Sequence, residues 1–218
     1  MPSDLPPSYA ALHQRLGNPV LQEVLNQAVR LSLADGVPQT DSQMAVLLYL
    51  LATIKSPHNI LEIGTGYGYS TLLLAGATQA KIVTIESDPR CVQVAGRLFA
   101  QARLEERIRL VGDNALTVLA TAPGEAFDLV FIDADKSLYP QYLALVRPLL
   151  AKNALLIADD IFFNGEINGK VVPEFSKPEI FEGLAVYRRL VCEQPEWVSS
   201  LLPIGCGLAI SIFRGEAA

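Results

Sequence analysis

The sequence predicts an α/β fold in which a mostly parallel sheet carries helices on both faces. Apolar runs of strand length alternate with segments of helical period, the order expected of a parallel sheet. A glycine-rich turn links the first run to a helix. The last two runs are separated only by Gly205 and Cys206, a link that permits a hairpin and forbids a parallel crossover. We therefore expect the sheet to end with an antiparallel strand.

The individual elements follow from the pattern of apolar residues. Runs rich in Ile, Val and Leu predict strands at 59–64, 81–86, 107–112, 127–133, 154–159, 197–204 and 207–213. Helices are expected between them at 69–77, 89–103, 114–120 and 138–150. The first 55 residues are expected to be helical, with a break at 35–38, and 164–178 is expected to be a loop long enough to serve binding. We expect one domain over 1–218, with a helical cap at 1–55 and an α/β core at 56–218.

The composition is that of a globular protein. The chain has 218 residues, half of them hydrophobic and 18% charged, which is enough for one domain with a substantial core. Its net charge of −6 argues against a nucleic-acid partner, because phosphate backbones attract basic surfaces. Three cysteines without CxxC spacing fit a reducing compartment. The N-terminus lacks a basic signal region, and the longest apolar run, 44–54, is too short to cross a bilayer. We expect a soluble, cytoplasmic protein that does not bind membranes.

The glycine-rich turn LEIGTGYGYS is the first candidate for ligand binding. Gly64, Gly66 and Gly68 permit a tight turn and a close approach of the backbone to a ligand. The dinucleotide fingerprint G-x-G-x-x-G would need glycine at the position of Tyr69. The spacing G-x-G-x-G is the looser form common in enzymes that use S-adenosylmethionine. By itself it is also compatible with a simple turn.

Acidic residues at the ends of the next two strands strengthen that interpretation. Glu86 ends the second strand, about twenty residues after the loop, where an acid can bind both ribose hydroxyls. The alternative is a charged residue that merely leaves a strand. Asp113 or Asn114 follows the third strand and could face an adenine amino group, or cap the following helix, or do both.

Three further carboxylates are expected at the same edge of the sheet. Asp133 ends the fourth strand, and Asp159 and Asp160 end the fifth. Ligands of open α/β sheets bind beyond the carboxyl ends of the strands. Converging carboxylates repel one another unless a positive charge compensates, and oxygen ligands suit Mg²⁺, Mn²⁺ or Ca²⁺. His13 and His58 stand alone and are interpreted as ordinary surface or packing residues.

Lys136 follows Asp133 by three residues in FIDADK. Beside a divalent cation and a sulfonium, its pKa would be lowered, which suits it to accept a proton. Elsewhere in the chain a lysine without a task would be the default interpretation. Asp135 is interpreted as structural, either as a cap of the helix that follows or as a support for Lys136.

These motifs together resemble the cation-dependent O-methyltransferases, the group that includes caffeoyl-CoA and catechol O-methyltransferases. The resemblance lies in LEIGTGYGYSTL, IVTIESD, FIDADKSLY and LIADDIFFNGEI, and SSLLPIGCGLAISI resembles the closing hairpin of that family. It extends from about Gln43 to the C-terminus. It implies a Rossmann-like class I methyltransferase fold with a seven-stranded sheet, S-adenosylmethionine as methyl donor and Mg²⁺, Mn²⁺ or Ca²⁺ as metal. It also implies a homodimer and a small phenolic acceptor with vicinal hydroxyls, such as a hydroxycinnamate or flavonoid.

The resemblance also assigns roles to residues. It implies metal ligands at Asp133, Asp159 and Asp160 and a general base at Lys136, with Asp133 also in the catalytic site. The implied donor site comprises Glu62, Gly64, Gly66, Gly68, Ser70, Glu86, Asp113, Asn114, Ala115 and Asp133. The third metal ligand of the family is usually Asn, and here it is Asp160, which keeps the oxygen and adds a negative charge.

Three other functions compete with this interpretation. Relatives of the family methylate hydroxylated tRNA uridine, although the acidic total charge speaks against RNA. A nucleotide-binding oxidoreductase is disfavoured by Tyr69 and by the carboxylates. A non-catalytic protein on this fold is possible in principle, because fold does not fix function, but Lys136 and three carboxylates argue against it.

Overall fold

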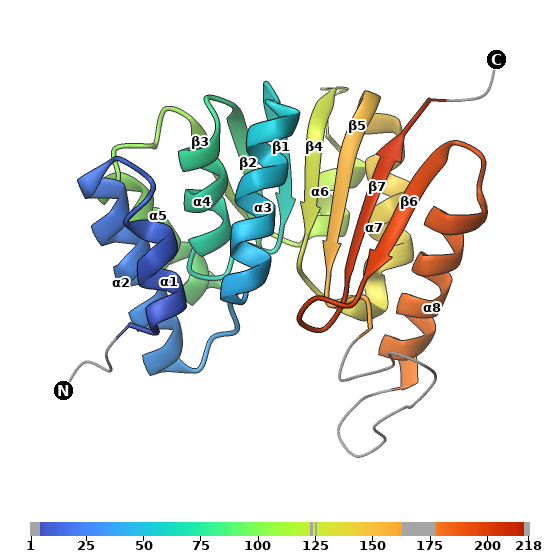
Figure 1. Ribbon diagram of the computed structural model, residues 1–218. Helices are drawn as coiled ribbons and strands as arrows, with labels where there is room; N and C mark the ends of the chain where they lie inside the picture. Colours follow the sequence, from blue (N-terminus) through green and yellow to red (C-terminus); the bar gives the residue numbers. More distant parts are fainter. Residues whose placement is uncertain (1–4, 123, 125, 163–177, 216–218) are drawn as a thin grey trace. The chain divides into compact units, whose positions relative to one another are not determined.

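The computed structural model describes residues 5–122, 124, 126–162 and 178–215. The strands form a seven-stranded sheet in the order β3-β2-β1-β4-β5-β7-β6 (Figure 1). The pairs β2–β3, β1–β4 and β4–β5 are parallel, whereas β7 runs antiparallel to both β5 and β6. The predicted fold class is therefore confirmed. The antiparallel strand β7 lies between β5 and β6, so one edge of the sheet is β6 and not the antiparallel strand that we expected there.

The chain forms two compact units, Met1–His58 with Gly64–Asn114, and Asn59–Ile63 with Ala115–Ala218. The elements of the first unit are α1 (Pro7–His13), α2 (Pro19–Asp35), α3 (Ser42–Lys55), α4 (Tyr69–Ala77), β2 (Lys81–Glu86), α5 (Pro89–Gln101) and β3 (Ile108–Gly112).

The long N-terminal helices begin and end where the local sequence requires. The side chain of Asn18 accepts hydrogen bonds from the N–H groups of Val20 and Leu21, and Pro19 occupies the first turn of α2. Gly36 ends α2 in the left-handed region, with φ of 68°. Asp41 caps α3 in the same way as Asn18 caps α2. The helical start of the chain and its predicted break at 35–38 are thus observed.

The amphipathic helix α5 contributes one face to the core of the first unit. Its buried residues recur at helical spacing, at Cys91, Val94, Ala95, Leu98 and Phe99. This face packs on β2 and β3, whose register pairs Ile82 with Ile108 and Glu86 with Gly112. The register leaves Glu86 at the carboxyl end of β2.

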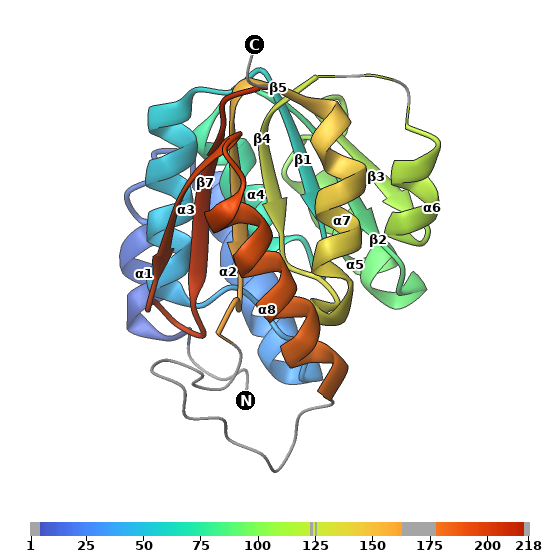
Figure 2. The ribbon, with the colours of Figure 1, turned by 90° about the vertical axis from the view of Figure 1, so that its right-hand side faces the viewer.

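The second unit contains the remaining strands. Its elements are β1 (Asn59–Ile63), α6 (Ala115–Ala120), β4 (Phe127–Ile132), the 3₁₀ turn η1 (Lys136–Leu138), α7 (Tyr139–Val146), the 3₁₀ turn η2 (Arg147–Leu149), β5 (Leu150–Asp159), α8 (Pro178–Glu193), β6 (Trp197–Leu202) and β7 (Leu208–Phe213). Helices α7 and α8 pack side by side on one face of the strands of this unit (Figure 2).

The parallel pairs of the second unit align the strand ends. Residues 129–132 of β4 are fully buried, as expected of a strand covered on both faces. The register places Ile63 opposite Ile132, and Ile132 opposite Ala158. Asp133 and Asp159, which follow the last two of these residues, therefore lie at the same edge.

The structure corrects the predicted limits of two elements and adds one. The helix predicted over 138–150 ends at Val146, because Pro148 interrupts the helical hydrogen bonds in η2. Strand β5 begins at Leu150 rather than at Ala154, since Leu150 already pairs with Phe127. Helix α8 was not predicted. Of the predicted loop 164–178, residues 164–177 lie outside the described residues, and Pro178 begins α8. Among the described helices, none has both the length and the apolar composition needed to cross a bilayer.

Candidate active site

Asp133 and Lys136 are brought together by the chain that leaves β4. The N–H of Asp133 donates to the carbonyl oxygen of Ile63 (2.9 Å), which continues the parallel β1–β4 ladder by one residue. Asp135 caps η1, because its Oδ1 accepts hydrogen bonds from the N–H (3.0 Å) and the hydroxyl (2.7 Å) of Ser137. This turn directs Lys136 back toward Asp133, where its Nζ lies 2.8 Å from Oδ1.

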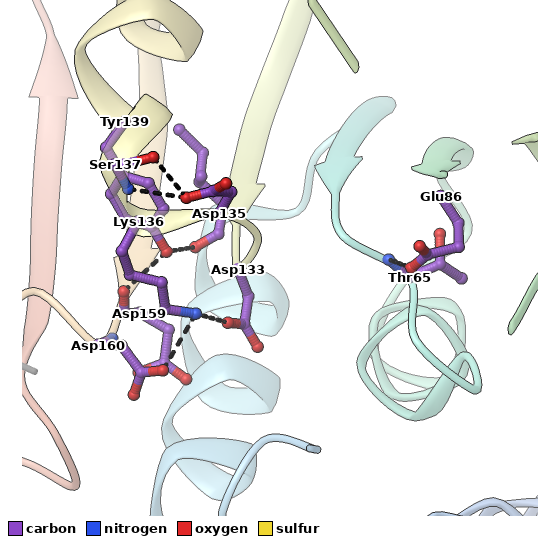
Figure 3. A network of polar contacts seen from close by, with 10 residues as sticks. Thr65, Glu86, Asp133, Asp135, Lys136, Ser137, Tyr139, Asp159 and Asp160 are labelled. Atoms are coloured by element: carbon purple, nitrogen blue, oxygen red, sulfur yellow. Dashed lines mark hydrogen bonds and ion pairs between the residues drawn. The ribbon is translucent and has the colours of Figure 1, made fainter. Parts of the chain in front are cut away.

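Lys136 also contacts the end of β5. Its Nζ lies 3.1 Å from Oδ2 of Asp160, and its side chain is only 14% exposed (Figure 3). Burial lowers the pKa of Lys136, but the carboxylates of Asp133 and Asp160 more than offset this, and the pKa is raised above its ordinary value. Without a metal ion, the lysine is therefore a protonated counter-charge. This rise in the pKa of Lys136 is opposite to the lowering predicted for a lysine beside a divalent cation.

Asp159 and Asp160 differ in their surroundings. Asp159 is 6% exposed, and its Oδ1 accepts the N–H of Asp160 (2.8 Å). Burial, followed by the charges of Asp133 and Asp160, raises the pKa of Asp159 to about 8. Asp160 adopts a left-handed backbone with φ of 58°, a conformation that Asp and Asn adopt more readily than other side chains.

Tyr139 contacts the carboxyl ends of both β4 and β5, and the sequence analysis did not identify it. Its buried hydroxyl lies 2.9 Å from the carbonyl oxygen of Asp159 and 3.3 Å from that of Ile132, so it can donate a shared hydrogen bond to β5 and β4. Its ring centroid lies 6.0 Å from Nζ of Lys136. The spacing of three residues between Lys136 and Tyr139 was the available signal for this contact.

The three carboxylates fit a hard divalent cation in chemistry. All donors are oxygens, and Asp133 and Asp160 point at one positive charge. The pKa of Asp159 is raised first by burial and then by the charges of Asp133 and Asp160, and a metal would relieve the second of these causes. In the structure, Lys136 occupies the space between Asp133 and Asp160. With the side chains arranged in this way, no group of three His, Cys, Asp or Glu residues in the described part of the chain is placed to hold a metal. Metal binding by Asp133, Asp159 and Asp160 remains a prediction.

The glycine loop of the first unit has the backbone that the sequence predicted. Gly64, Gly66 and Gly68 all have positive φ, at 93°, 53° and 84°. Gly68 is the N-terminal cap of α4, and a Cβ added there would lie 2.6 Å from the ring of Phe99. The loop therefore requires glycine at this position for space as well as for conformation.

Glu86 holds this loop directly. Its Oε2 accepts hydrogen bonds from the N–H groups of Thr65 (3.2 Å) and Gly66 (2.8 Å), as Figure 3 shows for Thr65. Its Oε1 accepts the N–H of Asp88 (2.9 Å). A carboxylate offers about four acceptor positions, so binding of a ribose hydroxyl would use the remaining one or replace one of these bonds.

The other predicted donor residues are placed as follows. Glu62 is fully buried in β1, and Ser70 is buried in the first turn of α4. Asp113 and Asn114 are exposed after β3, where Oδ1 of Asp113 accepts the N–H of Asn114 (2.6 Å). Ala115 begins α6. The structure assigns Glu62 and Ala115 to the second unit and the others to the first, so it does not by itself assemble a donor site from all of them.

His13 is a packing residue, as expected, but it contacts the helix that follows the glycine loop. Its ring nitrogens lie 2.7 Å from Oδ1 of Asn26 and 3.0 Å from the hydroxyl of Tyr69. Tyr9 packs edge-on against the Tyr69 ring, with centroids 5.5 Å apart. Tyr69, which replaces the third glycine of a dinucleotide fingerprint, therefore attaches α1 to the start of α4.

Comparison with known proteins gives a consistent result. The model of the O-methyltransferase family matches residues 14–212. Catechol O-methyltransferase of Mycobacterium tuberculosis is 36% identical over 128 residues, an alignment that spans 58% of each chain and so little more than half of that relative. An O-methyltransferase of Bacillus cereus, solved in complex with SAH (S-adenosylhomocysteine), has a TM-score of 0.80 at 25% identity, covering 98% of this chain and 100% of its own. A Staphylococcus aureus structure described as a caffeoyl-CoA O-methyltransferase has a TM-score of 0.81 at 28% identity, covering 93% of this chain and 96% of its own.

Proposed function

This chain belongs to the O-methyltransferase family, and we propose that it methylates one hydroxyl of a catechol-type phenol, with S-adenosylmethionine as donor and a divalent cation as cofactor. The observation that carries the proposal is the cluster in which Lys136 lies between Asp133 and Asp160, with Asp159 adjacent. Two features of the relatives support it: the SAH bound to the Bacillus cereus structure and the catechol named for the mycobacterial relative.

The donor is assigned to the glycine loop of the first unit. Positive φ at three glycines, which carry no side chain, lets a ligand approach the backbone of the loop closely. Glu86, at the end of β2, accepts hydrogen bonds from the N–H groups of Thr65 and Gly66 and offers its carboxylate to ribose hydroxyls. S-adenosylmethionine, when bound, supplies an electrophilic methyl group on a sulfonium.

The acceptor and the metal are assigned to the carboxylate cluster of the second unit. Asp133, Asp159 and Asp160 would hold a cation such as Mg²⁺, Mn²⁺ or Ca²⁺, which when bound lowers the pKa of a coordinated phenol hydroxyl. Lys136 takes the proton from that hydroxyl at Nζ. Because its raised pKa keeps Lys136 protonated beside two unneutralised carboxylates, the role of base requires another cation to take over their charge. The metal and the base are therefore coupled in this proposal.

The remaining expectations concern partners and location. A net charge of −6 supports a small-molecule acceptor over tRNA. Cys91, Cys192 and Cys206 form no disulfide in the part of the chain that the structure describes, which supports a reducing, cytoplasmic location. We propose a homodimer on the basis of the family, and light scattering of the purified protein tests it. The predicted division into a cap at 1–55 and a core at 56–218 also stays a proposal.

A methyl-transfer screen tests the function. Purified protein is incubated with labelled S-adenosylmethionine and vicinal-diol phenols, with matched phenols whose second hydroxyl is already methylated, and with tRNA. We expect transfer to the diols, in the presence of Mg²⁺, and none to the blocked phenols or to tRNA. Transfer to tRNA alone would replace the proposal with the RNA alternative. A fluorescence titration with NADH that shows tight binding, together with no transfer, would favour an oxidoreductase.

A further inference from the structure

The glycine loop is attached to helix α2 by a hydrogen bond that spans thirty-two residues. The hydroxyl of Tyr67, in the middle of the loop, donates to Oδ2 of Asp35 at 2.7 Å. The same oxygen accepts an ion-paired hydrogen bond from Arg90 of α5 at 2.8 Å. Tyr67 is 2% exposed, whereas the Arg90 side chain is 59% exposed. Of the two partners of Asp35, Tyr67 is thus the buried one.

Asp35 is poorly placed for the helix that contains it. It is the last residue of α2, where the carbonyl ends of the helix dipole make a negative charge unfavourable. The end of the helix is already completed by Gly36, whose N–H donates to the carbonyl oxygen of Ser32. Helix stability therefore does not explain an acid at this position, whereas the contact with Tyr67 does.

Tyr67 lies in the part of the loop that is richest in glycine, so its hydrogen bond to Asp35, called the tether below, restrains the most flexible part of the backbone. It lies between Gly66 and Gly68, both with positive φ, and glycines leave a loop with the greatest conformational freedom in the unbound protein. Glu86 holds the N–H groups of the preceding residues, Thr65 and Gly66. Asp35 holds the next residue by its side chain. The loop is fixed from the end of β2 on one side and from the end of α2 on the other.

We propose that Tyr67 and Asp35 are positioning residues for donor binding, which hold the glycine loop in its binding conformation before the donor arrives. The inference rests on the proposed function, in which this loop takes S-adenosylmethionine. A loop that is already ordered loses less conformational entropy when the ligand binds, so the tether raises affinity without touching the donor. Its loss should raise the dissociation constant and the donor KM, and leave kcat at saturating donor unchanged.

Four variants test the tether by calorimetric titration with SAH. Tyr67→Phe removes only the hydroxyl, and Asp35→Ala removes the acceptor. Because Asp35 is exposed to water, its charged hydrogen bond is weaker than a buried one, and we expect about a five- to twentyfold weaker dissociation constant for each. The double variant should be no weaker than the single ones, because both remove the same bond. Asp35→Asn retains an acceptor oxygen and should recover affinity to within about threefold of the parent.

Two measurements separate positioning from simple destabilisation. Tyr67→Phe leaves no buried polar group without a partner, because Asp35 keeps its ion pair with Arg90, so its melting temperature should stay close to that of the parent while its SAH affinity falls. Arg90→Ala is the matched control, since it removes the exposed ion pair with the same carboxylate and should change affinity by less than about twofold.

The outcomes are distinct. If the parent protein binds no SAH, the proposed function fails and this inference fails with it. If the parent binds SAH and Tyr67→Phe binds it equally well, the function stands and the tether is wrong. Additive losses in the double variant, or a lower kcat at saturating donor with an unchanged donor KM, would also overturn the tether.

Discussion

The ammonium group of Lys136 lies 3.1 Å from the carboxylate of Asp160, at the point where the chain leaving β5 turns into the left-handed region. Lys136 follows β4 and Asp160 follows β5, and each affects the charge state of the other. Asp133 and Asp160 together raise the pKa of Lys136 and keep it charged, and Lys136 in turn is the positive partner of both carboxylates. A divalent cation at this place would change both at once, and the predictions below follow from that coupling.

Activity should depend on a divalent metal. The reason is that Asp133, Asp159 and Asp160 bring carboxyl oxygens together where one ammonium group pairs with two of them, and where the pKa of Asp159 is raised to about 8, chiefly by burial. A chelator should abolish methyl transfer, and excess Mg²⁺ or Mn²⁺ should restore it. The measurement is the initial rate of transfer to a vicinal-diol phenol, with metal content checked by mass spectrometry. Full activity in a verified metal-free sample would exclude a metal role.

Asp160 should act through both its oxygen and its charge. Asp160→Asn keeps the ligand oxygen and tolerates the left-handed φ of 58°, so we expect measurable activity and modestly weaker metal binding. Asp160→Ala also removes the oxygen and should weaken Mn²⁺ binding more than Asp160→Asn does. A Mn²⁺ titration of the three proteins compares them. Equal affinity of Asp160→Ala and the parent would show that Asp160 is not a ligand.

Lys136 should act in the chemical step. Lys136→Ala should lower kcat by about 10²-fold or more, the usual scale for loss of a general base, with little change in SAH affinity. Lys136→Arg is the matched control, because it keeps a positive charge between Asp133 and Asp160 but cannot release its proton near neutral pH. Both variants should therefore lose turnover. Retained turnover in Lys136→Arg would mean that charge, and not proton transfer, is what this position supplies.

Glu86 should control donor affinity. Its carboxylate orients the N–H groups of Thr65 and Gly66, and a charged hydrogen bond contributes about 1.5–3 kcal/mol. Glu86→Ala should therefore weaken SAH binding at least about tenfold. Glu86→Gln, which keeps one acceptor oxygen, should lie between this variant and the parent. Metal binding, measured with Mn²⁺, should be unchanged in both. Calorimetry that finds parent-like SAH affinity for Glu86→Ala would contradict the assignment.

Acid should loosen the N-terminal helices through His13. Burial lowers the pKa of His13 below its ordinary value of 6.5, only partly opposed by the hydrogen bond to Asn26. Below pH 6.5 the unfolded chain then binds more protons than the folded one, so stability present above that pH is lost as pH falls, by at most about 1.4 kcal/mol per pH unit. Urea unfolding at pH 7.5, 6.5 and 5.5 measures this loss. In His13→Gln the loss of unfolding free energy on acidification should be smaller. If the unfolding free energy of the two proteins fell equally with pH, the role of His13 would be refuted.

Local chemistry explains why much of the fold could be predicted. The apolar residues of β4 do not alternate with polar ones over 129–132, which is typical of a parallel strand that is covered on both faces. The positive φ values at Gly64, Gly66 and Gly68 follow from residues that alone adopt them freely. The hairpin of β6 and β7 follows from a link too short for a crossover. Each of these features depends on residues close together in the chain.

The errors arose where a distant partner decided the outcome. Strand β5 begins four residues early because Leu150 finds Phe127 on β4, which no local pattern shows. Helix α8 was also not predicted. Its Gly183 packs so closely on η1 that an added Cβ would lie 2.7 Å from the carbonyl oxygen of Ser137, a contact that the local sequence does not show. Packing of this kind overrides local propensity.

The sequence by itself therefore determined the fold class, the glycine loop and which acids follow which strands, because periodicity, turn residues and the common edge of parallel strands are properties of short segments. Only the tertiary structure decided which side chains meet: Lys136 with Asp160, Tyr139 with the ends of β4 and β5, Tyr69 with His13, and Tyr67 with Asp35. Hydrogen bonds and ion pairs form only within about 3–4 Å. That precision is set by the packing of whole elements on one another, which residue spacing along the chain does not encode.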